Sequence, residues 1–245
     1  MYGSLPTSLR CLTNLRTLSL FRCRLIDDGI SVIGALENLE ILRFGDSYIK
    51  ELPKEIIGHR AHLKVLDLLG CVVERIYPGV LSSLSKLEEL YVGSIFRSWC
   101  EVEESKEGAK AIIDELASLS NLVALDIALI NISFWPRGLV IEKLKKFNIR
   151  VGISYSYIPI RFSLSNRLVL EVENMSDIIE TRLNFLWKST EILILNSSVK
   201  GLKILCDLVG EGGFECLTYL SLSKFRWGST ECFPCVRLYM ALWFG

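Results

Sequence analysis

Four groups of aliphatic residues recur along this chain at one fixed interval, and no other feature constrains the fold as strongly. The groups begin 24 residues apart, at Leu15, Leu39, Leu63 and Leu87. In each group a second apolar residue follows three positions on and a third follows five positions on. A motif that returns at such a period predicts a chain that coils, with one copy of the motif in each turn.

The spacing inside each group is that of a short strand. Alternate side chains of a strand point to opposite faces, so Leu18 and Leu20 would point inward while Thr17 and Ser19 point outward. One coil cannot bury its own leucines, and stacked coils bury them against each other in a parallel sheet. The pattern is that of a leucine-rich repeat. We therefore predict an α/β leucine-rich-repeat solenoid, a horseshoe with a parallel concave sheet and an irregular or short-helical convex side.

A small residue is expected eight positions after the start of each group, where the chain turns away from the sheet. Cys23, Ser47 and Cys71 meet this expectation, and a small polar side chain there can bond the backbone groups of the turn. Ile95 and Ile130 do not meet it, so the turn is less well defined in those two coils. Between two groups, the spacing of Ile30, Ile33 and Leu36 predicts a short helix on the convex side.

The period slips after the fourth group. A fifth group begins at Leu122, 35 residues after Leu87, which predicts an insert at about residues 98–110. The insert carries an acidic run, and we interpret it as a solvated loop, with a partner-contacting loop as the alternative. The run consists of Glu101, Glu103, Glu104 and Glu107.

Further groups follow with a blurred register. A sixth begins at Leu144, a seventh contains Leu193 and Leu195, and an eighth begins at Leu217. Between the sixth and seventh, about residues 153–185, we expect an irregular or paired-strand excursion. The predicted organisation is one repeat domain over residues 1–228, followed by a non-repetitive tail over residues 229–245.

The charge balance excludes some classes of partner. The 28 basic and 28 acidic residues give no net charge, which argues against nucleic acid or an anionic membrane as the main partner. No run of 18 apolar residues is present, so no membrane span is expected. The N-terminus carries no signal segment, and the eight cysteines show no disulfide-framework spacing, so we expect a reduced, cytoplasmic protein. Three of these cysteines, Cys11, Cys206 and Cys216, are interpreted as buried thiols.

The sequence contains no motif that predicts catalysis. His59 and His62 are the two histidines and lack further metal ligands, so a solvated pair is the simpler interpretation. Cys232 and Cys235 have redox or zinc spacing but stand alone in the tail, and the glycines of residues 210–213 lack the strand and helix of a phosphate loop. We therefore predict no enzyme activity, no cofactor and no metal.

The candidate binding site follows from the alternation of the strands. One outward position recurs in six groups, and on the concave sheet these six residues would form a single column that contacts a protein ligand. Arginine and tyrosine are frequent anchors of interfaces. The plain alternative is a set of solvated outward positions. The column consists of Ser19, Arg43, Asp67, Tyr91, Asp126 and Asn148.

Several phrases go beyond a generic repeat. They include "LPTSLRCLTNLRTLSLFRCRL", "LENLEILRFGDSYIKELPKEI", "HLKVLDLLGC", "VLSSLSKLEELYVG" and "WPRGLVIEKLKKFNIRVG". Their order resembles the repeat region of plant disease-resistance proteins of the coiled-coil, nucleotide-binding, leucine-rich-repeat type, over about residues 5–225. The resemblance implies an intracellular immune receptor whose repeats sense a pathogen effector or a host protein and contact the nucleotide-binding domain. That domain is absent from this chain, and the apolar, uncapped ends lead us to expect a fragment.

Three other interpretations stay open. A substrate-receptor subunit of a ubiquitin ligase would require an F-box upstream, which the chain lacks. An extracellular repeat receptor would want a signal peptide and cap disulfides. It would give meaning to three glycosylation sequons that we interpret as chance, at Asn131, Asn174 and Asn196. A truncated gene product without function is the third alternative.

Overall fold

The computed structural model describes most of the chain in eight stretches. They are residues 5–25, 28–52, 54–59, 62–100, 106–152, 165–172, 175–197 and 213–223. The predicted tail at residues 229–245 lies outside these stretches, as do Cys206, Cys232, Cys235 and Asn174. None of the helices within these stretches combines the length and the apolar character needed to cross a membrane.

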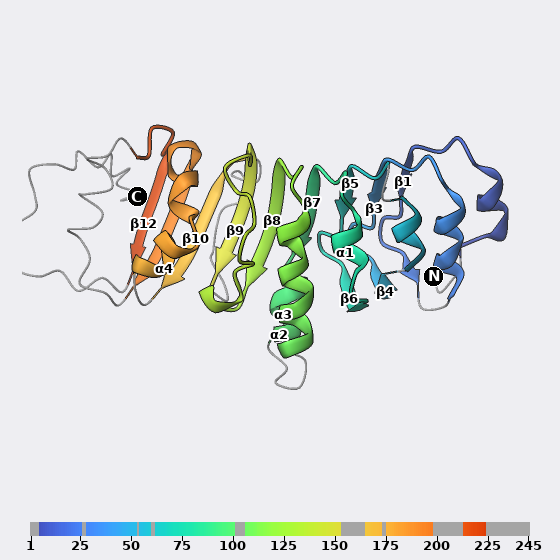
Figure 1. The fold of residues 1–245 in the computed structure, drawn as a ribbon, viewed down its shortest axis with the longest axis horizontal. Coiled ribbons are helices and arrows are strands. Elements are labelled where there is room, and N and C mark those ends of the chain that lie inside the picture. Colours follow the sequence, from blue (N-terminus) through green and yellow to red (C-terminus); the bar gives the residue numbers. More distant parts are fainter. Residues whose placement is uncertain are drawn as a thin grey trace, which may run out of the picture.

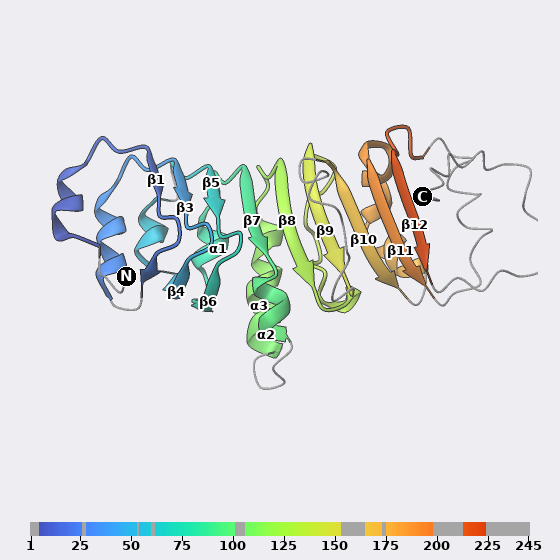
Figure 2. The same ribbon diagram turned by 180° about the vertical axis from the view of Figure 1, so that it is seen from behind.

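The main feature of the fold is one long parallel sheet (Figure 1). Within the described stretches it has nine strands, which stand in chain order, and short helices cover one side of the sheet while the other side stays open (Figure 2). This architecture is a leucine-rich-repeat solenoid, as the period of the leucines predicted. In order, the strands are β1 (Thr17–Ser19), β3 (Ile41–Arg43), β5 (Val65–Asp67), β7 (Glu89–Gly93), β8 (Ala124–Leu129), β9 (Lys146–Val151), β10 (Arg167–Val172), β11 (Ile192–Ser197) and β12 (Tyr219–Ser223).

The inward residues of the strands form the core. Leu42, Leu66 and Leu90 are paired in register on neighbouring strands and are fully buried. Leu18 pairs with Leu42 at the end of the sheet and is half-buried. Stacking the coils therefore removes the leucines from water. The burial of each leucine stabilises the fold by about 1.5–3 kcal/mol. The predicted single file of leucines beneath adjacent strands is confirmed.

A second sheet runs along the first three coils, and the sequence reasoning did not predict it. It consists of β2 (Arg24–Leu25), β4 (Tyr48–Leu52) and β6 (Val72–Ile76), all parallel. The small turn residues explain why the chain can enter it. The Ser47 hydroxyl accepts a hydrogen bond from the Cys23 amide at 2.9 Å and donates to the Leu20 carbonyl at 2.9 Å. The Cys71 thiol donates to the Phe44 carbonyl at 3.2 Å, as the proposed role of this position requires.

The fourth coil turns differently because Ile95 stands where a small residue is expected. The pairing of β7 with β8 shifts register between Tyr91 and Gly93, and Gly93 has a φ of +56°. Ile95 then begins a helix, α2 (Ile95–Cys100), in place of a further strand.

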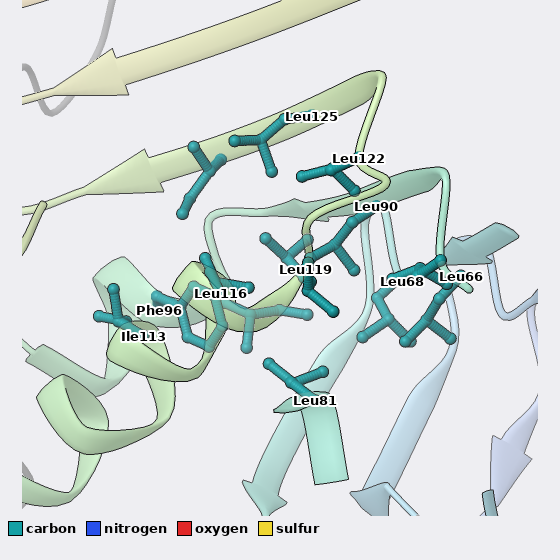
Figure 3. Close-up of a cluster of buried hydrophobic side chains, with 14 of the residues drawn as sticks. Leu66, Leu68, Leu81, Leu90, Phe96, Ile113, Leu116, Leu119, Leu122 and Leu125 are labelled. Atoms are coloured by element: carbon teal, nitrogen blue, oxygen red, sulfur yellow. The ribbon is translucent and has the colours of Figure 1, made fainter. Parts of the chain in front are cut away.

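The insert is helical, so our interpretation of residues 98–110 as a solvated loop was wrong for its described part. Residues 98–100 belong to α2 and residues 106–110 to α3 (Lys106–Asp114), while residues 101–105 lie outside the described stretches. Figure 3 shows Phe96 of α2 and Ile113 of α3 within the buried cluster that contains Leu90 and Leu125. Cys100 and Ala109, which lie inside the predicted insert, are buried in the same cluster, so the insert adds to the core.

Helix α2 also contacts the second sheet. The indole nitrogen of Trp99 donates a hydrogen bond to the Val73 carbonyl of β6 at 2.8 Å. Because β6 is the last strand of the second sheet, this bond satisfies a carbonyl at the edge of that sheet.

Short helices line the side of the main sheet that faces the core. The predicted helix over Ile30, Ile33 and Leu36 is present as η2, which ends at Ala35. The others also span a turn or two, as convex segments of repeat solenoids do. Together with η2 (Asp28–Ala35), the short helices are η1 (Thr7–Cys11), η3 (Lys54–His59), α1 (Val80–Ser83), η5 (Glu115–Ser118), η6 (Ile132–Phe134), α4 (Met175–Glu180) and η8 (Leu183–Ser189).

The predicted excursion at residues 153–185 contains a regular coil in its described part. Strand β10 pairs with β9 through Arg167 and Asn148, and Leu168 and Leu170 are fully buried. Helix α4 and the start of η8 follow, and residues 153–164 lie outside the described stretches. The coil was missed because Ser165 stands three positions before Leu168, where a leucine normally begins the motif.

Two thiols are more accessible than predicted. Cys11 and Cys216 are exposed, whereas both had been interpreted as buried. Cys11 ends the short helix η1, in which no residue is buried, so the apolar neighbours in its sequence do not enclose it.

Candidate functional site

The six residues of the predicted column lie side by side on the open face of the main sheet. Strand pairing joins each of them to the next, from Ser19 in β1 to Asn148 in β9. The pairing continues the same row through Arg167, Ile192 and Tyr219. Whether the row binds a ligand stays a prediction, but the geometry that such a role requires is present.

The first half of the row is polar and half-exposed. The Arg43 and Asp67 side chains form a loose ion pair, with Nε and Oδ2 3.9 Å apart. The other oxygen of Asp67 accepts a hydrogen bond from the Leu69 amide at 3.0 Å. Asp67 is therefore held in place by its own turn, while the Arg43 guanidinium stays about half exposed.

Tyr91 stands in the middle of the row. Its hydroxyl donates a hydrogen bond to Glu89 at 2.8 Å. Burial, together with this hydrogen bond, raises the pKa of Tyr91 above its ordinary value. The hydroxyl therefore stays protonated at neutral pH, and the ring presents an aromatic surface with a polar end.

The second half of the row contains a more buried polar cluster. Asp126 accepts hydrogen bonds from Asn148 Nδ2 at 2.7 Å and from Arg150 at 3.2 Å, and its side chain is 14% exposed. Burial outweighs the attraction of Arg150 and raises the pKa of Asp126. Two buried atoms of the cluster, Asn148 Oδ1 and Arg150 Nε, have no hydrogen-bond partner in the described structure. The cluster thus retains bonding capacity within the open face.

A shallow pocket of about 520 Å³ links the two halves. Arg43, Asp67, Tyr91, Asp126 and Asn148 all line it, so five of the six predicted residues share one hollow. The remaining lining residues are Leu69, Glu89, Leu125, Lys146, Phe147, Ser165 and Asn166.

One end of the pocket lies where β9 and β10 pair out of step with the leucine motif. Because Arg167 pairs with Asn148, the start of β9 extends beyond β10. Asn166 occupies this end. Its side chain accepts from the Phe147 amide at 3.1 Å and donates to the Lys145 and Ser189 carbonyls, each at 3.1 Å. An amide side chain thus replaces strand pairing there.

A second row on the open face is apolar, and the sequence reasoning did not select it. Phe21 and Leu69 are exposed, at 57% and 36% of their surface, and lie two strands apart. Each leans toward a glycine of the next coil. A Cβ atom at Gly45 would lie 3.1 Å from the Phe21 ring, and one at Gly93 would lie 3.3 Å from Leu69 Cδ2. The two glycines therefore let one edge of the Phe21 ring and one methyl group of Leu69 approach the next coil closely.

Alternation along the strands could have found part of what was missed. Phe21 lies two residues after Ser19, and Arg150 lies two residues after Asn148, so both face outward with the column. Asn166 gave no such signal, because its place depends on the shifted pairing of β10. The arrangement as a whole offers hydrogen-bond donors, acceptors and apolar surface. Among the described residues, no three His, Cys, Asp or Glu side chains gather as ligands of one metal ion.

No protein-family model matches the chain. Among curated proteins, podocan of Mus musculus is 30% identical over 130 residues, which are 51% of this chain and 19% of podocan. The chain thus spans about a fifth of the length of that relative.

Among solved structures, similar chains include the plant peptide hormone receptor RGFR1 in complex with RGF2, with 18% identity and a TM-score of 0.48 over 92% of this chain and 31% of that one. A leucine-rich-repeat protein of Leptospira interrogans has 20% identity and a TM-score of 0.44, over 91% and 52% of the two chains. The ectodomain of the Arabidopsis thaliana membrane receptor kinase GASSHO1/SCHENGEN3 has 15% identity and a TM-score of 0.47, over 91% and 26%. These values are too low to assign the chain to the family of any of these proteins.

Proposed function

We propose that the open face of the main sheet recognises a protein or peptide ligand. The observation that carries this proposal is the continuous row of six outward residues, five of which share one pocket. Repeat solenoids use extended surfaces of this kind for binding. Arg43 and Tyr91 would be the anchors, because a half-exposed guanidinium and a partly buried phenol combine apolar area with directional hydrogen bonds.

A selection from a random dodecapeptide display library, with the whole chain as bait, tests this proposal. The double variant Arg43→Ala, Tyr91→Ala should bind the selected peptides at least about tenfold more weakly. A matched control exists on the second sheet, where the Arg24 guanidinium stacks on Tyr48 at 5.0 Å. Arg24→Ala, Tyr48→Ala should leave binding unchanged. Equal losses in both double variants, or selected peptides that ignore the row, would contradict the proposal.

The finer form of the proposal places this recognition in an intracellular plant immune receptor. Its support is the resemblance of the repeat phrases to those of coiled-coil, nucleotide-binding, leucine-rich-repeat resistance proteins. In this form the chain is cytoplasmic, its ligand is a pathogen effector or a host protein, and its second partner is a nucleotide-binding domain.

Transient expression in leaves tests the immune role. A receptor that joins this repeat region to its nucleotide-binding domain should lose effector-dependent cell death when Arg43 and Tyr91 are replaced by alanine. The Arg24→Ala, Tyr48→Ala control should keep it. Failure of the repeat region to co-precipitate with the nucleotide-binding domain, together with an unchanged response, would remove the immune proposal and leave the binding proposal intact.

The sequon at Asn131 provides a test of the cytoplasmic location. Its side chain is exposed and caps η6, with Oδ1 accepting from the Ser133 amide at 3.0 Å. A protein that passes through the secretory pathway could therefore carry a glycan there. The mass of the chain purified from plant cells should be unaffected by glycosidase. A glycan on Asn131 would contradict the cytoplasmic proposal.

A further inference from the structure

The apolar row of Phe21 and Leu69 has a spacing that favours one kind of ligand backbone. Phe21 belongs to the coil of β1 and Leu69 to the coil of β5, and strand β3 lies between these two strands. Neighbouring strands lie about 4.8 Å apart, so the two exposed platforms are about 9.6 Å apart. A ligand that touches both must repeat an apolar side chain at this interval.

Three regular backbones can be compared with that interval. A polyproline II helix places residues i and i+3 on one face about 9.3 Å apart, which matches. A β-strand places i and i+2 about 6.7 Å apart on one face and i+4 about twice as far, and neither distance fits. An α-helix has residues i and i+7 about 10.5 Å apart, but its carbonyl oxygens are already bonded to its own amides, so it offers none to a donor between the platforms.

The polar groups beside the platforms suit the same backbone. A polyproline II segment has no internal hydrogen bonds, so its carbonyl oxygens require donors from its surroundings. Arg43 lies on the strand between the two platform coils, and its guanidinium is 48% exposed and only loosely paired with Asp67 at 3.9 Å. It can therefore donate to a carbonyl of a segment that crosses from Phe21 to Leu69. The Phe21 ring stays exposed and adds aromatic surface, although the Arg22 guanidinium covers one of its faces at 4.8 Å from the ring centre.

We propose that the ligand segment recognised by this surface is a proline-rich polyproline II stretch of a protein partner, with an apolar residue at every third position. It lies across β1, β3 and β5, with residue i on Phe21, residue i+3 on Leu69, and a carbonyl between them on Arg43. This inference rests on the proposed function, because it names the class of ligand for the same open face.

Fluorescence anisotropy with three labelled dodecapeptides tests the proposal on the full chain. Each carries three leucines and the same numbers of proline and serine, and the leucines stand at every second, every third or every fourth position. The peptide with leucine at every third position should bind at least about tenfold more tightly than the other two. Tighter binding of the peptide with alternate leucines would overturn the proposal in favour of a strand-like ligand, and equal or absent binding of all three would also overturn it.

Two variants and one control locate the contact. Phe21→Ala and Leu69→Ala should each weaken binding of the threefold peptide at least fivefold. Val72→Ala removes a side chain that is as exposed as Phe21 but lies on β6 of the second sheet, and it should change nothing. Thermal unfolding of each variant, unchanged within a few degrees, shows that the fold persists.

The two proposals fail in different ways. Library-selected peptides that depend on Arg43 and Tyr91 but not on Phe21 or Leu69 would refute the polyproline ligand and leave recognition by the open face standing. If no selected peptide depends on Arg43, Tyr91, Phe21 or Leu69, both the proposed function and the polyproline ligand are refuted.

Discussion

The two halves of the solenoid are built from the same ladder but differ in regularity. From β1 to β7, each residue of a strand pairs with the residue 24 positions further along the chain, on the next strand. Later steps vary, from Asn148 to Arg167 at β9–β10 and from Ile192 to Tyr219 at β11–β12. The regular half carries the second sheet, and the irregular half carries the insert helices and the buried Asp126 cluster.

This difference follows from a few residues at the turns. A small residue after the strand lets the chain turn tightly and extend again, as at Ser47 and Cys71. A large residue at Ile95 leads into helix α2, and the second sheet ends at β6. The lesson is that the inward leucines specify the stacking of coils, while the turn residue decides what each coil does on its other side.

The largest predicted effect concerns the regular ladder. Leu66→Asp places an unpaired carboxylate at a fully buried position and should cost about 4 kcal/mol or more in the free energy of unfolding. Its neighbour Asp67 faces outward, so Asp67→Ala should cost about 1 kcal/mol, from the lost bond to the Leu69 amide. Urea unfolding measures both. Similar losses for the two variants would break the inward and outward assignment.

The second prediction concerns the join between β9 and β10. Gly152 has a φ of +86°, and a Cβ there would lie 2.6 Å from Glu171 Cβ and 3.0 Å from the Glu171 carbonyl oxygen. Gly152→Ala should therefore destabilise the chain by about 2 kcal/mol. Gly58→Ala is the control, because a Cβ at Gly58 meets nothing within 4 Å. If Gly152→Ala is as well tolerated as the control in thermal unfolding, the irregular join is not packed as described.

The third prediction tests the role of the turn residue. Ser47→Ala leaves the Cys23 amide and the Leu20 carbonyl without their partner and should cost about 1–3 kcal/mol. Ser85 is exposed, so Ser85→Ala should stay within about 0.5 kcal/mol of the parent. Chemical denaturation compares the two. Equal stabilities would mean that the serine does not organise the turn.

The smallest effect is a pH dependence from the irregular half. Burial raises the pKa of Asp126, so the folded chain binds this proton more tightly than the unfolded chain does. Protonated Asp126 therefore contributes stability that is fully present below the pKa of this carboxyl in the unfolded chain. That contribution is lost as the pH rises through its pKa in the folded chain. Asp126→Asn removes this dependence, so the stability of the variant relative to the parent should rise between about pH 3 and pH 7. A relative stability that falls over this range would contradict the assignment.

Sequence reasoning reached the sheet and its outward row because both depend on local alternation. The pairing of Leu18, Leu42, Leu66 and Leu90 follows directly from the 24-residue period. The second sheet was not reached, because β2 has two residues and no periodicity can be read from so short a strand. The helices α2 and α3 were not predicted, because the acidic run separates the buried Phe96 and Ala109 and interrupts the apolar spacing that indicates a helix.

The candidate site was likewise predictable only in part. The outward position of Asp126 follows from alternation, but its bonds to Asn148 and Arg150 depend on how β8 and β9 pair. The contribution of Asn166 arises from the two-residue displacement of β10 relative to the leucine motif. The sequence does not indicate this displacement, because Ser165 stands where a leucine would begin the motif. Long-range register, unlike alternation, is decided by packing across coils that are distant in sequence.

The most direct test of the whole account is a distance measured along the row. Spin labels at Ser19→Cys and Asn148→Cys, in a chain whose other exposed thiols are replaced, stand five strand steps apart. At about 4.8 Å for each step, double electron–electron resonance should give one narrow distribution near about 24 Å. A broad distribution, or a distance beyond about 40 Å, would show that the strands do not form one continuous sheet and would contradict the proposed binding face.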